Sequence, residues 1–273
     1  MNDRTLPLTA AKARPAPPRE PVLVVRKHDL WVRVSHWGHV PLLVGLIGTG
    51  LAIYWAAPVF RHAPTPGNPR GDYLADLGIA LASRFGTSSA PSLWLYERAS
   101  LGPSQLASAL RLHWLFAYLY MVCGAMYVLG LLRGGGWRAL MPRASDPAEA
   151  LAMIRFYLGV IPNALAKRPW PHPPVAGKYN ALQRGAYLTM PLVGLLVVLS
   201  GWAMHHPATL PWLERAFWNY DGARVVHFAC MLILGGFMVP HILLVAADGW
   251  DTFRSMVTGW STRVRKEERH GPA

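Results

Sequence analysis

The distribution of charge along the chain is the feature that most constrains its fold. Only four stretches of about 18 residues or more lack Asp, Glu, Lys and Arg: 34–60, 112–132, 185–213 and 225–247. A helix of that length crosses a hydrocarbon core about 30 Å thick at about 1.5 Å per residue. Backbone groups in lipid must be hydrogen-bonded within the chain, so such runs predict helices rather than strands. We expect an all-α integral membrane protein, a bundle of four helices at about 34–57, 109–132, 182–204 and 223–247.

The composition excludes several classes of function. The 273 residues are 52% hydrophobic and only 15% charged, whereas a soluble domain has about 25% charged residues. The net charge of +13 does not indicate nucleic-acid binding, because the charges lie between the apolar runs and not over a polar surface. Cys123 and Cys230 are too few for a disulfide framework, a four-cysteine zinc site or an iron–sulfur cluster. The partner that the composition does predict is membrane lipid.

The positive charges predict the topology. Twenty of the 27 Lys and Arg residues lie in 1–33, 133–184 and 248–273, and the others lie in 61–111 and 214–224. Excess positive charge stays on the cytoplasmic side of a membrane. Both termini are therefore expected to be cytoplasmic.

The segments between the spans have their own expected roles. Residues 1–25, rich in Pro, Ala and Arg, and residues 261–273 are predicted to be cytoplasmic tails, the first of them disordered, on either side of a domain at 26–260. The first tail lacks the apolar core of a signal peptide. The loop 61–106 should lie outside, either as a docking surface for an outer partner or as a flexible spacer.

The cytoplasmic loop, 133–181, contains a helix start. Asp146 is placed as an N-cap, Pro147 as the first helical residue and Glu149 as the third. They predict an amphipathic helix over about 147–161 that lies on the inner membrane surface, and Pro162 should end it.

Histidines are the informative residues of the spans, because ionisable side chains inside a membrane are rare and normally functional. His36 and His39 fall at the inner end of the first span, and His113 falls at the outer end of the second. The fourth span carries His227 near its outer end and His241 towards its inner end. Their 14-residue separation corresponds to about 21 Å and to four turns less about 40°, so both rings leave nearly one face. Topology alone places His36 at the depth of His241, and His113 at the depth of His227.

Two depths with two imidazoles each, on facing helices, predict two haem b groups, each with two histidine ligands. A zinc site is disfavoured because each depth offers only two clear ligands and no acid or thiolate. A proton relay is disfavoured because the spans contain no Asp or Glu. A third alternative is a set of hydrogen-bonded interior histidines.

Other residues near the two depths leave alternatives open. His39 could replace His36 as a ligand, and His205 and His206 could compete with His113, although a hydrated interfacial role suits them better. Arg33 and Arg224 each precede a candidate ligand by three residues, which suits either a haem propionate or an ordinary boundary charge. The remaining histidines lie in tails or loops and are expected to be solvated: His28, His62, His172 and His270.

Several short pieces of the sequence resemble one known family, the bacterial cytochrome b561 and nickel-hydrogenase b-type cytochrome subunits, which include the formate dehydrogenase gamma and thiosulfate reductase cytochrome b subunits. In order, the pieces are RVSHW at 33–37, RLHW at 111–114, GKYNALQ at 177–183, GARVVHF at 222–228, His241 and FRSMVTG at 253–259. The resemblance covers about residues 26–260.

The resemblance implies an electron-transfer subunit of the bacterial inner membrane with two haem b groups. His36 and His241 would ligate the inner haem iron, and His113 and His227 would ligate the outer one. It also implies a quinone site beside the inner haem, matched here by the amides of Asn180 and Gln183. Helix capping is the alternative role for these two residues.

The resemblance further implies the function. The chain would carry electrons between the quinone pool of a respiratory chain and a periplasmic oxidoreductase subunit of the molybdopterin or iron–sulfur class. One alternative is a stand-alone b561-type quinone reductase that oxidises a small reductant such as superoxide. Another is a haem-free membrane anchor or transporter. A partner subunit that co-purifies, turnover by the isolated chain, or a colourless protein would distinguish the three.

Overall fold

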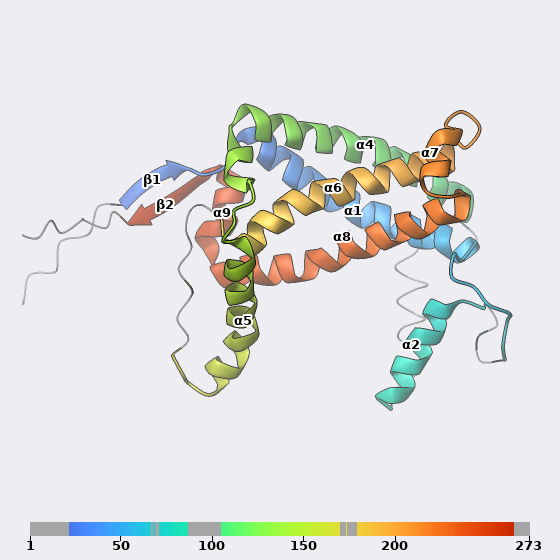
Figure 1. The fold of residues 1–273 in the computed structure, drawn as a ribbon, viewed down its shortest axis with the longest axis horizontal. Helices are drawn as coiled ribbons and strands as arrows, with labels where there is room; N and C mark the ends of the chain where they lie inside the picture. The colour runs from blue at the N-terminus through green and yellow to red at the C-terminus, as the bar shows by residue number, and fades with distance from the viewer. Residues whose placement is uncertain are drawn as a thin grey trace, which may run out of the picture.

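Four long helices lie side by side and form one elongated bundle in the computed structural model (Figure 1). The structure describes residues 22–66, 68, 71–86, 105–169, 173 and 179–264. The bundle consists of α1 (Leu30–Ala56), α4 (Leu106–Arg133), α6 (Ala181–His205) and α8 (Tyr220–Asp248). Each has the length and apolar composition of a membrane span. The prediction of an all-α integral membrane bundle is confirmed, and each helix overlaps the span expected for it.

Within the bundle, α1 packs most extensively on α4, and α6 on α8. Glycines allow the close approach of the first pair. A Cβ atom at Gly45 of α1 would lie 2.6 Å from Cε2 of Phe116, and one at Gly130 of α4 would lie 2.8 Å from Cβ of Trp31. Small residues allow helix backbones to approach closely in lipid, where packing replaces the hydrophobic effect as the driving force. The bundle is therefore two closely packed helix pairs.

Several exposed aromatic side chains lie towards the ends of the long helices. Trp31 and Trp37 belong to the first two turns of α1, whereas Trp202 belongs to the last turn of α6. Trp212 and Tyr220 are also exposed, near the start of α8. Trp and Tyr are enriched at membrane boundaries because their rings are apolar and carry one polar group. Their placement is the one expected of a bundle whose ends reach the two membrane surfaces.

The helix predicted over 147–161 is α5 (Asp146–Leu165), and it continues past Pro162. The prediction that Pro162 ends it is wrong. A proline removes one backbone donor, and in the last turn of a helix only one intrahelical bond is lost. The backbone bonds from Ala166 N to Pro162 O and from Arg168 N to Asn163 O, both 3.0 Å, complete that turn. In Figure 1, α5 and the shorter α2 cross the direction of the bundle at its two ends.

The connection 61–106 contains α2 (Tyr73–Arg84), and its start is fastened to the end of α1. Asp72 is only 1% exposed, caps α2 by accepting from Leu74 N, and accepts a 2.8 Å bond from Tyr54 Oη of α1. His62 was expected to be solvated, and this is wrong, because its Nε2 lies 2.7 Å from Asp76 Oδ2 and its side chain is mostly buried. Asp76, in the first turn of α2, is thus the partner of His62.

A small antiparallel sheet joins the two ends of the described chain. Strand β1 (Val22–Arg26) pairs with β2 (Trp260–Val264), with Val22 opposite Val264. Residues 22–25 were expected to be part of a disordered tail, and this is wrong, because they form most of β1. Residues 261–264 of the second expected tail belong to β2. Each strand is five residues long and its partner is remote in sequence, so no local pattern revealed the pairing. Residues 1–21 and 265–273, the rest of the expected tails, lie outside the described residues.

Three short elements complete the description. A 3₁₀ helix, η2, follows α4, α7 lies between α6 and α8, and α9 leads into β2; their bounds are Gly136–Leu140, Pro211–Ala216 and Trp250–Thr258. In the first turn of α9, Asp251 accepts hydrogen bonds from Ser261 Oγ (2.5 Å) and Thr262 Oγ1 (2.9 Å). These bonds hold β2 against α9.

Candidate functional site

Two of the histidines predicted to share a depth lie opposite each other near the start of α1. The ring centroids of His36 on α1 and His241 on α8 are 6.0 Å apart, with an interplanar angle of 67°. Aromatic rings flank both, since Phe237 stacks on His241 and the edge of Trp37 meets His36. We call these two residues the first histidine pair.

The other two predicted partners lie opposite each other near the start of α4. The ring centroids of His113 on α4 and His227 on α8 are 6.1 Å apart, at 56°. Hydroxyl groups accompany both rings. Thr49 Oγ1 lies 2.9 Å from Nδ1 of His113, and Ser200 Oγ lies 3.2 Å from Nδ1 of His227. We call His113 and His227 the second histidine pair.

The separation within each pair fits an iron ion held between two imidazoles. A bond from a metal ion to an imidazole nitrogen is about 2.0 Å, and the ring centroid lies about 1.1 Å beyond that nitrogen, so two rings on opposite sides of one ion have centroids about 6.2 Å apart. The observed 6.0 and 6.1 Å agree with this value. Among the described residues there is no group of three or more His, Cys, Asp or Glu that could hold a metal ion. Two-ligand sites of this kind suit haem, whose porphyrin supplies the other four ligands.

His39, the alternative to His36, is directed elsewhere. Its Nδ1 is 2.7 Å from the carbonyl oxygen of Ser35, and its ring meets Tyr120 of α4 edge-on at 4.9 Å. The residue that faces His241 is therefore His36. The possible competitor His205 stacks on Trp114, with ring centroids 3.7 Å apart.

The two arginines expected near haem propionates have different surroundings. Arg224 already has partners, because its Nη2 donates to the carbonyl oxygen of Ala57 and its Nη1 donates to Asp221 Oδ1 at 3.0 Å. Arg33 lies beside Gly259, and its Nε is buried with no hydrogen-bond partner in the described part of the chain. A buried donor of this kind normally has a partner, so Arg33 has the stronger case for an anionic ligand group.

Asn180 and Gln183 form the capping box of α6. The side-chain oxygen of Asn180 accepts from Gln183 N at 2.9 Å, and the side-chain oxygen of Gln183 accepts from Asn180 N at 3.1 Å. Both amide oxygens are thus used to begin the helix. The capping role, one of the two alternatives from the sequence, is what the geometry shows.

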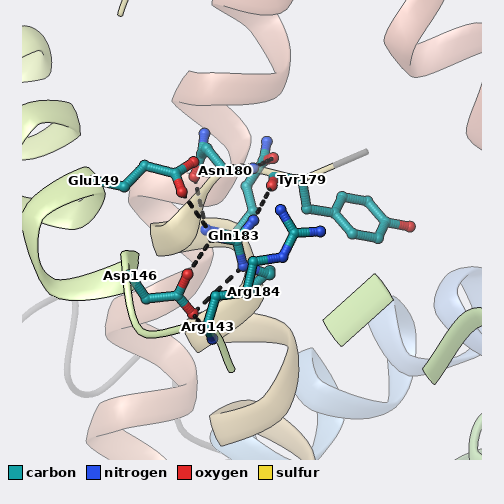
Figure 2. A network of polar contacts seen from close by, with 7 residues as sticks. All are labelled: Arg143, Asp146, Glu149, Tyr179, Asn180, Gln183 and Arg184. Atoms are coloured by element: carbon teal, nitrogen blue, oxygen red, sulfur yellow. Dashed lines mark hydrogen bonds and ion pairs between the residues drawn. The ribbon is translucent and has the colours of Figure 1, made fainter. Parts of the chain in front are cut away.

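Beside this cap, an ion-pair network that sequence reasoning missed is centred on a buried arginine (Figure 2). Arg184 is 2% exposed and donates to Asp146 and Glu149 of α5 and, at 2.6 Å, to the carbonyl oxygen of Tyr179. The hydrogen bond from the Arg184 side chain, followed by one from the backbone of Arg143, lowers the pKa of Asp146. The network holds α5 to the start of α6. Two acids three residues apart on one face of α5 were the available signal.

Comparison with known proteins identifies the family. Residues 27–259 match the family model described as prokaryotic cytochrome b561. The chain belongs to the prokaryotic cytochrome b561 family. A relative from Azospira oryzae, the putative protein-methionine-sulfoxide reductase subunit YedZ1, is 27% identical over 220 residues, which are 80% of this chain and 89% of the relative. No solved structure matches the chain.

Membership confirms the resemblance seen in the sequence. Proteins of this family are membrane haem proteins that bind haem b. The matched range includes both histidine pairs, Arg33, Arg224 and the α6 cap. An electron-transfer role for this multi-pass membrane protein fits these findings.

Proposed function

We propose that this cytochrome is a di-haem membrane subunit that carries electrons between the quinone pool and a periplasmic redox partner. The observation that carries the proposal is the presence of two facing histidine pairs at two depths of one four-helix bundle. His36 and His241 would ligate one haem iron, and His113 and His227 would ligate the other. Both pairs use α8, where 14 residues, about 21 Å along a helix, separate the two ligands.

The chain's own residues would orient and insulate the electron carriers. Haem iron, when bound, accepts and releases one electron at a time. The histidines come from α1, α4 and α8, so each pair joins one closely packed helix pair to the other. Apolar helices exclude water from both depths, and groups that hydrogen-bond the ligands tune their donor strength. The buried Nε of Arg33, which has no partner among the described residues, would donate to a propionate near the first pair, and Arg224 has the corresponding place in sequence near the second.

The charge distribution supports the orientation. The Lys and Arg residues concentrate in the N-terminal, 133–184 and C-terminal segments, which favours an orientation with both termini in the cytoplasm. Because the family is prokaryotic, the membrane would be the bacterial inner membrane. The first histidine pair would then lie towards the cytoplasm, and the second towards the periplasm.

A quinone site would lie at the cytoplasmic end. The amide oxygens of Asn180 and Gln183 cap α6, which leaves their amide nitrogens as the donors for a quinone carbonyl oxygen. A quinol that is oxidised there would release two protons to the cytoplasm and two electrons to the chain.

The partner would dock at the end that carries α2. Exposed apolar side chains recur there every four residues, at Tyr73, Leu77, Leu81 and Phe85, so they form one stripe on the helix. The polar side of α2 is already used, because Asp76 faces His62 and Asn68. In Figure 1, α2 lies at the end of the bundle where α4 begins. The second pair lies near the start of α4, so the α2 stripe is at the end where electrons would leave the membrane.

The partner belongs to the molybdopterin or iron–sulfur class of oxidoreductases in this proposal. The name of the relative from Azospira oryzae, a reductase subunit for protein methionine sulfoxide, supports outward electron flow. Two electrons and two protons convert a sulfoxide to a thioether and water, and one quinol supplies two electrons. The stoichiometry of such a pathway therefore balances.

The test is spectroscopy and purification from the native membrane. The full-length protein should contain two haem b per chain, both reducible by a quinol, and should co-purify with a periplasmic oxidoreductase. One haem or none would contradict the di-haem proposal. Superoxide-dependent quinone reduction by the isolated chain, without a partner, would instead support the stand-alone enzyme.

A further inference from the structure

The second histidine pair is supported by two matching dipeptides from neighbouring helices. Thr49-Gly50 of α1 contacts His113 of α4, and Ser200-Gly201 of α6 contacts His227 of α8. In both cases the hydroxyl lies within hydrogen-bond distance of Nδ1, at 2.9 Å and 3.2 Å. The supporting helix in each case is the one that packs most closely on the helix that carries the histidine.

The hydrogen bonds of each hydroxyl determine which atom donates. Thr49 Oγ1 donates to the carbonyl oxygen of Gly45 at 2.7 Å, and Ser200 Oγ donates to that of Leu196 at 2.8 Å. A hydroxyl has a single proton. Each hydroxyl therefore accepts from its imidazole, whose Nδ1 carries a hydrogen. The other ring nitrogen, Nε2, is then left with the lone pair that a metal ion requires.

The glycines bring the rings against the helix backbones. A Cβ atom at Gly201 would lie 3.3 Å from Cε1 of His227, and one at Gly50 would lie 3.5 Å from Cε1 of His113. Both hydroxyl residues are fully buried, with Thr49 3% and Ser200 0% exposed. Without water as a competitor, these hydrogen bonds persist. Among the described residues, no hydroxyl group is found with such a bond to His36 or His241.

We propose that Thr49 and Ser200 are positioning residues for the second haem, which fix the tautomer of its two histidine ligands and lower its reduction potential. This inference rests on the proposed di-haem function. A ligand imidazole that donates from Nδ1 is more basic at Nε2. A more basic ligand favours ferric over ferrous iron, so the potential falls. The two haems of one chain would differ because only one of them has these hydroxyl partners.

The experiment is a redox titration of the purified full-length protein followed through its haem absorption. Thr49→Val and Ser200→Ala should each raise the reduction potential of the same haem, the second, and leave that of the first haem unchanged. A tenfold change in the ratio of ferric to ferrous affinity, the lower end of typical outer-shell effects, corresponds to about 59 mV for a one-electron couple. Thr49→Ser and Ser200→Thr, which keep the hydroxyl, should retain the original potential.

A matched control is Ser35→Ala. Ser35 is as buried as Ser200, lies on α1, and its hydroxyl donates only to its own helix, to the carbonyl oxygen of Val32. This variant should leave the second component unchanged. The inference is overturned if Thr49→Val and Ser200→Ala leave both potentials unchanged, or if the conservative variants shift as far as the others.

Two further outcomes are separable. Wild-type protein without two haems would overturn the proposed function, whereas two haems with no shift in any variant would overturn this inference alone. Loss of one haem in Thr49→Val or Ser200→Ala, with full content in Thr49→Ser or Ser200→Thr, would support positioning by the hydroxyl. Loss in the hydroxyl-keeping variants as well would count against it.

Discussion

The two histidine pairs have nearly the same separation but different surroundings. Their ring centroids are 6.0 and 6.1 Å apart. The first pair is flanked by aromatic rings, with Phe237 on His241 and Trp37 at His36. The second pair is flanked by hydroxyl groups. The comparison teaches that one helical scaffold can repeat the separation of two histidines and vary the residues around them.

The pairs also differ in how they depend on the rest of the fold. Trp37 donates from Nε1 to the carbonyl oxygen of Met256 at the end of α9, and its ring packs on Phe253. The first pair therefore depends on α9 and on the sheet that follows it. The second pair depends on α1 and α6 inside the bundle. Changes in α9 or in the sheet should thus affect the first pair and leave the second pair unaffected.

The largest expected effect is the loss of one haem. His227→Ala would remove a proposed ligand of the second haem, and His241→Ala a proposed ligand of the first, so each variant should retain about half of the haem per protein. The spectra of the two variants should add up to that of the wild type. Unchanged haem content in either variant would contradict the ligand assignment, and haem-to-protein ratio with difference spectra is the measurement.

Crowding of one ring should affect the second pair alone. Gly201→Val places a branched Cβ against His227, where a Cβ atom would already lie 3.3 Å from Cε1, so we expect a loss of most of the second haem or a changed spectrum for it. Gly236→Val on α8 is the matched control, because a Cβ atom at Gly236 meets no described atom within 4 Å. Equal spectra for the two variants would show that packing at Gly201 does not position His227.

Disruption of the Arg184 network should lower the stability of the fold without affecting one histidine pair more than the other. Arg184→Met leaves Asp146 and Glu149 as neighbouring acids without their shared cation, so we expect a thermal midpoint lower by several degrees and faster proteolysis of α5. Arg254→Met is the control, since its pair with Asp251 is exposed and contributes little. A larger effect from the control would refute the role given to Arg184.

The smallest expected effect is the loss, at acid pH, of the attachment of β2 to α9, the helix that contacts Trp37 beside the first pair. Hydrogen bonds from the side chains of Ser261 and Thr262 lower the pKa of Asp251 below its usual 3.8. A carboxylate with a lowered pKa in the folded state stabilises it fully above the unfolded value, and this contribution is lost as pH falls through the folded value. The attachment of β2 should therefore persist down to pH 3.8, and Ser261→Ala should move its loss to higher pH.

Hydrogen exchange of residues 250–264 as a function of pH measures this effect. The spectrum of the first haem should change together with the exchange, because α9 contacts Trp37, while that of the second should not. Exchange in Ser261→Ala that follows the wild-type pH profile would contradict this assignment.

Much of the bundle was predictable because its signals are local. The charge-free runs predicted the four helices. The 14-residue spacing of His227 and His241 on α8 predicted two levels, and the topology predicted which histidine of α1 or α4 lies at each level. The capping box of α6 and, to within one residue, the start of α5 were also predictable from neighbouring residues. The extension of α5 past Pro162 was not, because the loss of one hydrogen bond in a last turn is offset by bonds to residues beyond it.

The sequence by itself determined the membrane class, the helices and the depth of each histidine, since apolar length and helical rise fix these before any helix meets another. Only the tertiary structure decided that His36 rather than His39 faces His241, that Arg184 holds two acids of α5, and that Thr49 and Ser200 reach the second pair. The physical reason is that hydrogen bonds and ring contacts depend on the rotation and closeness of packed helices. Those in turn depend on glycines such as Gly45 and Gly201, whose partners lie far away in the chain.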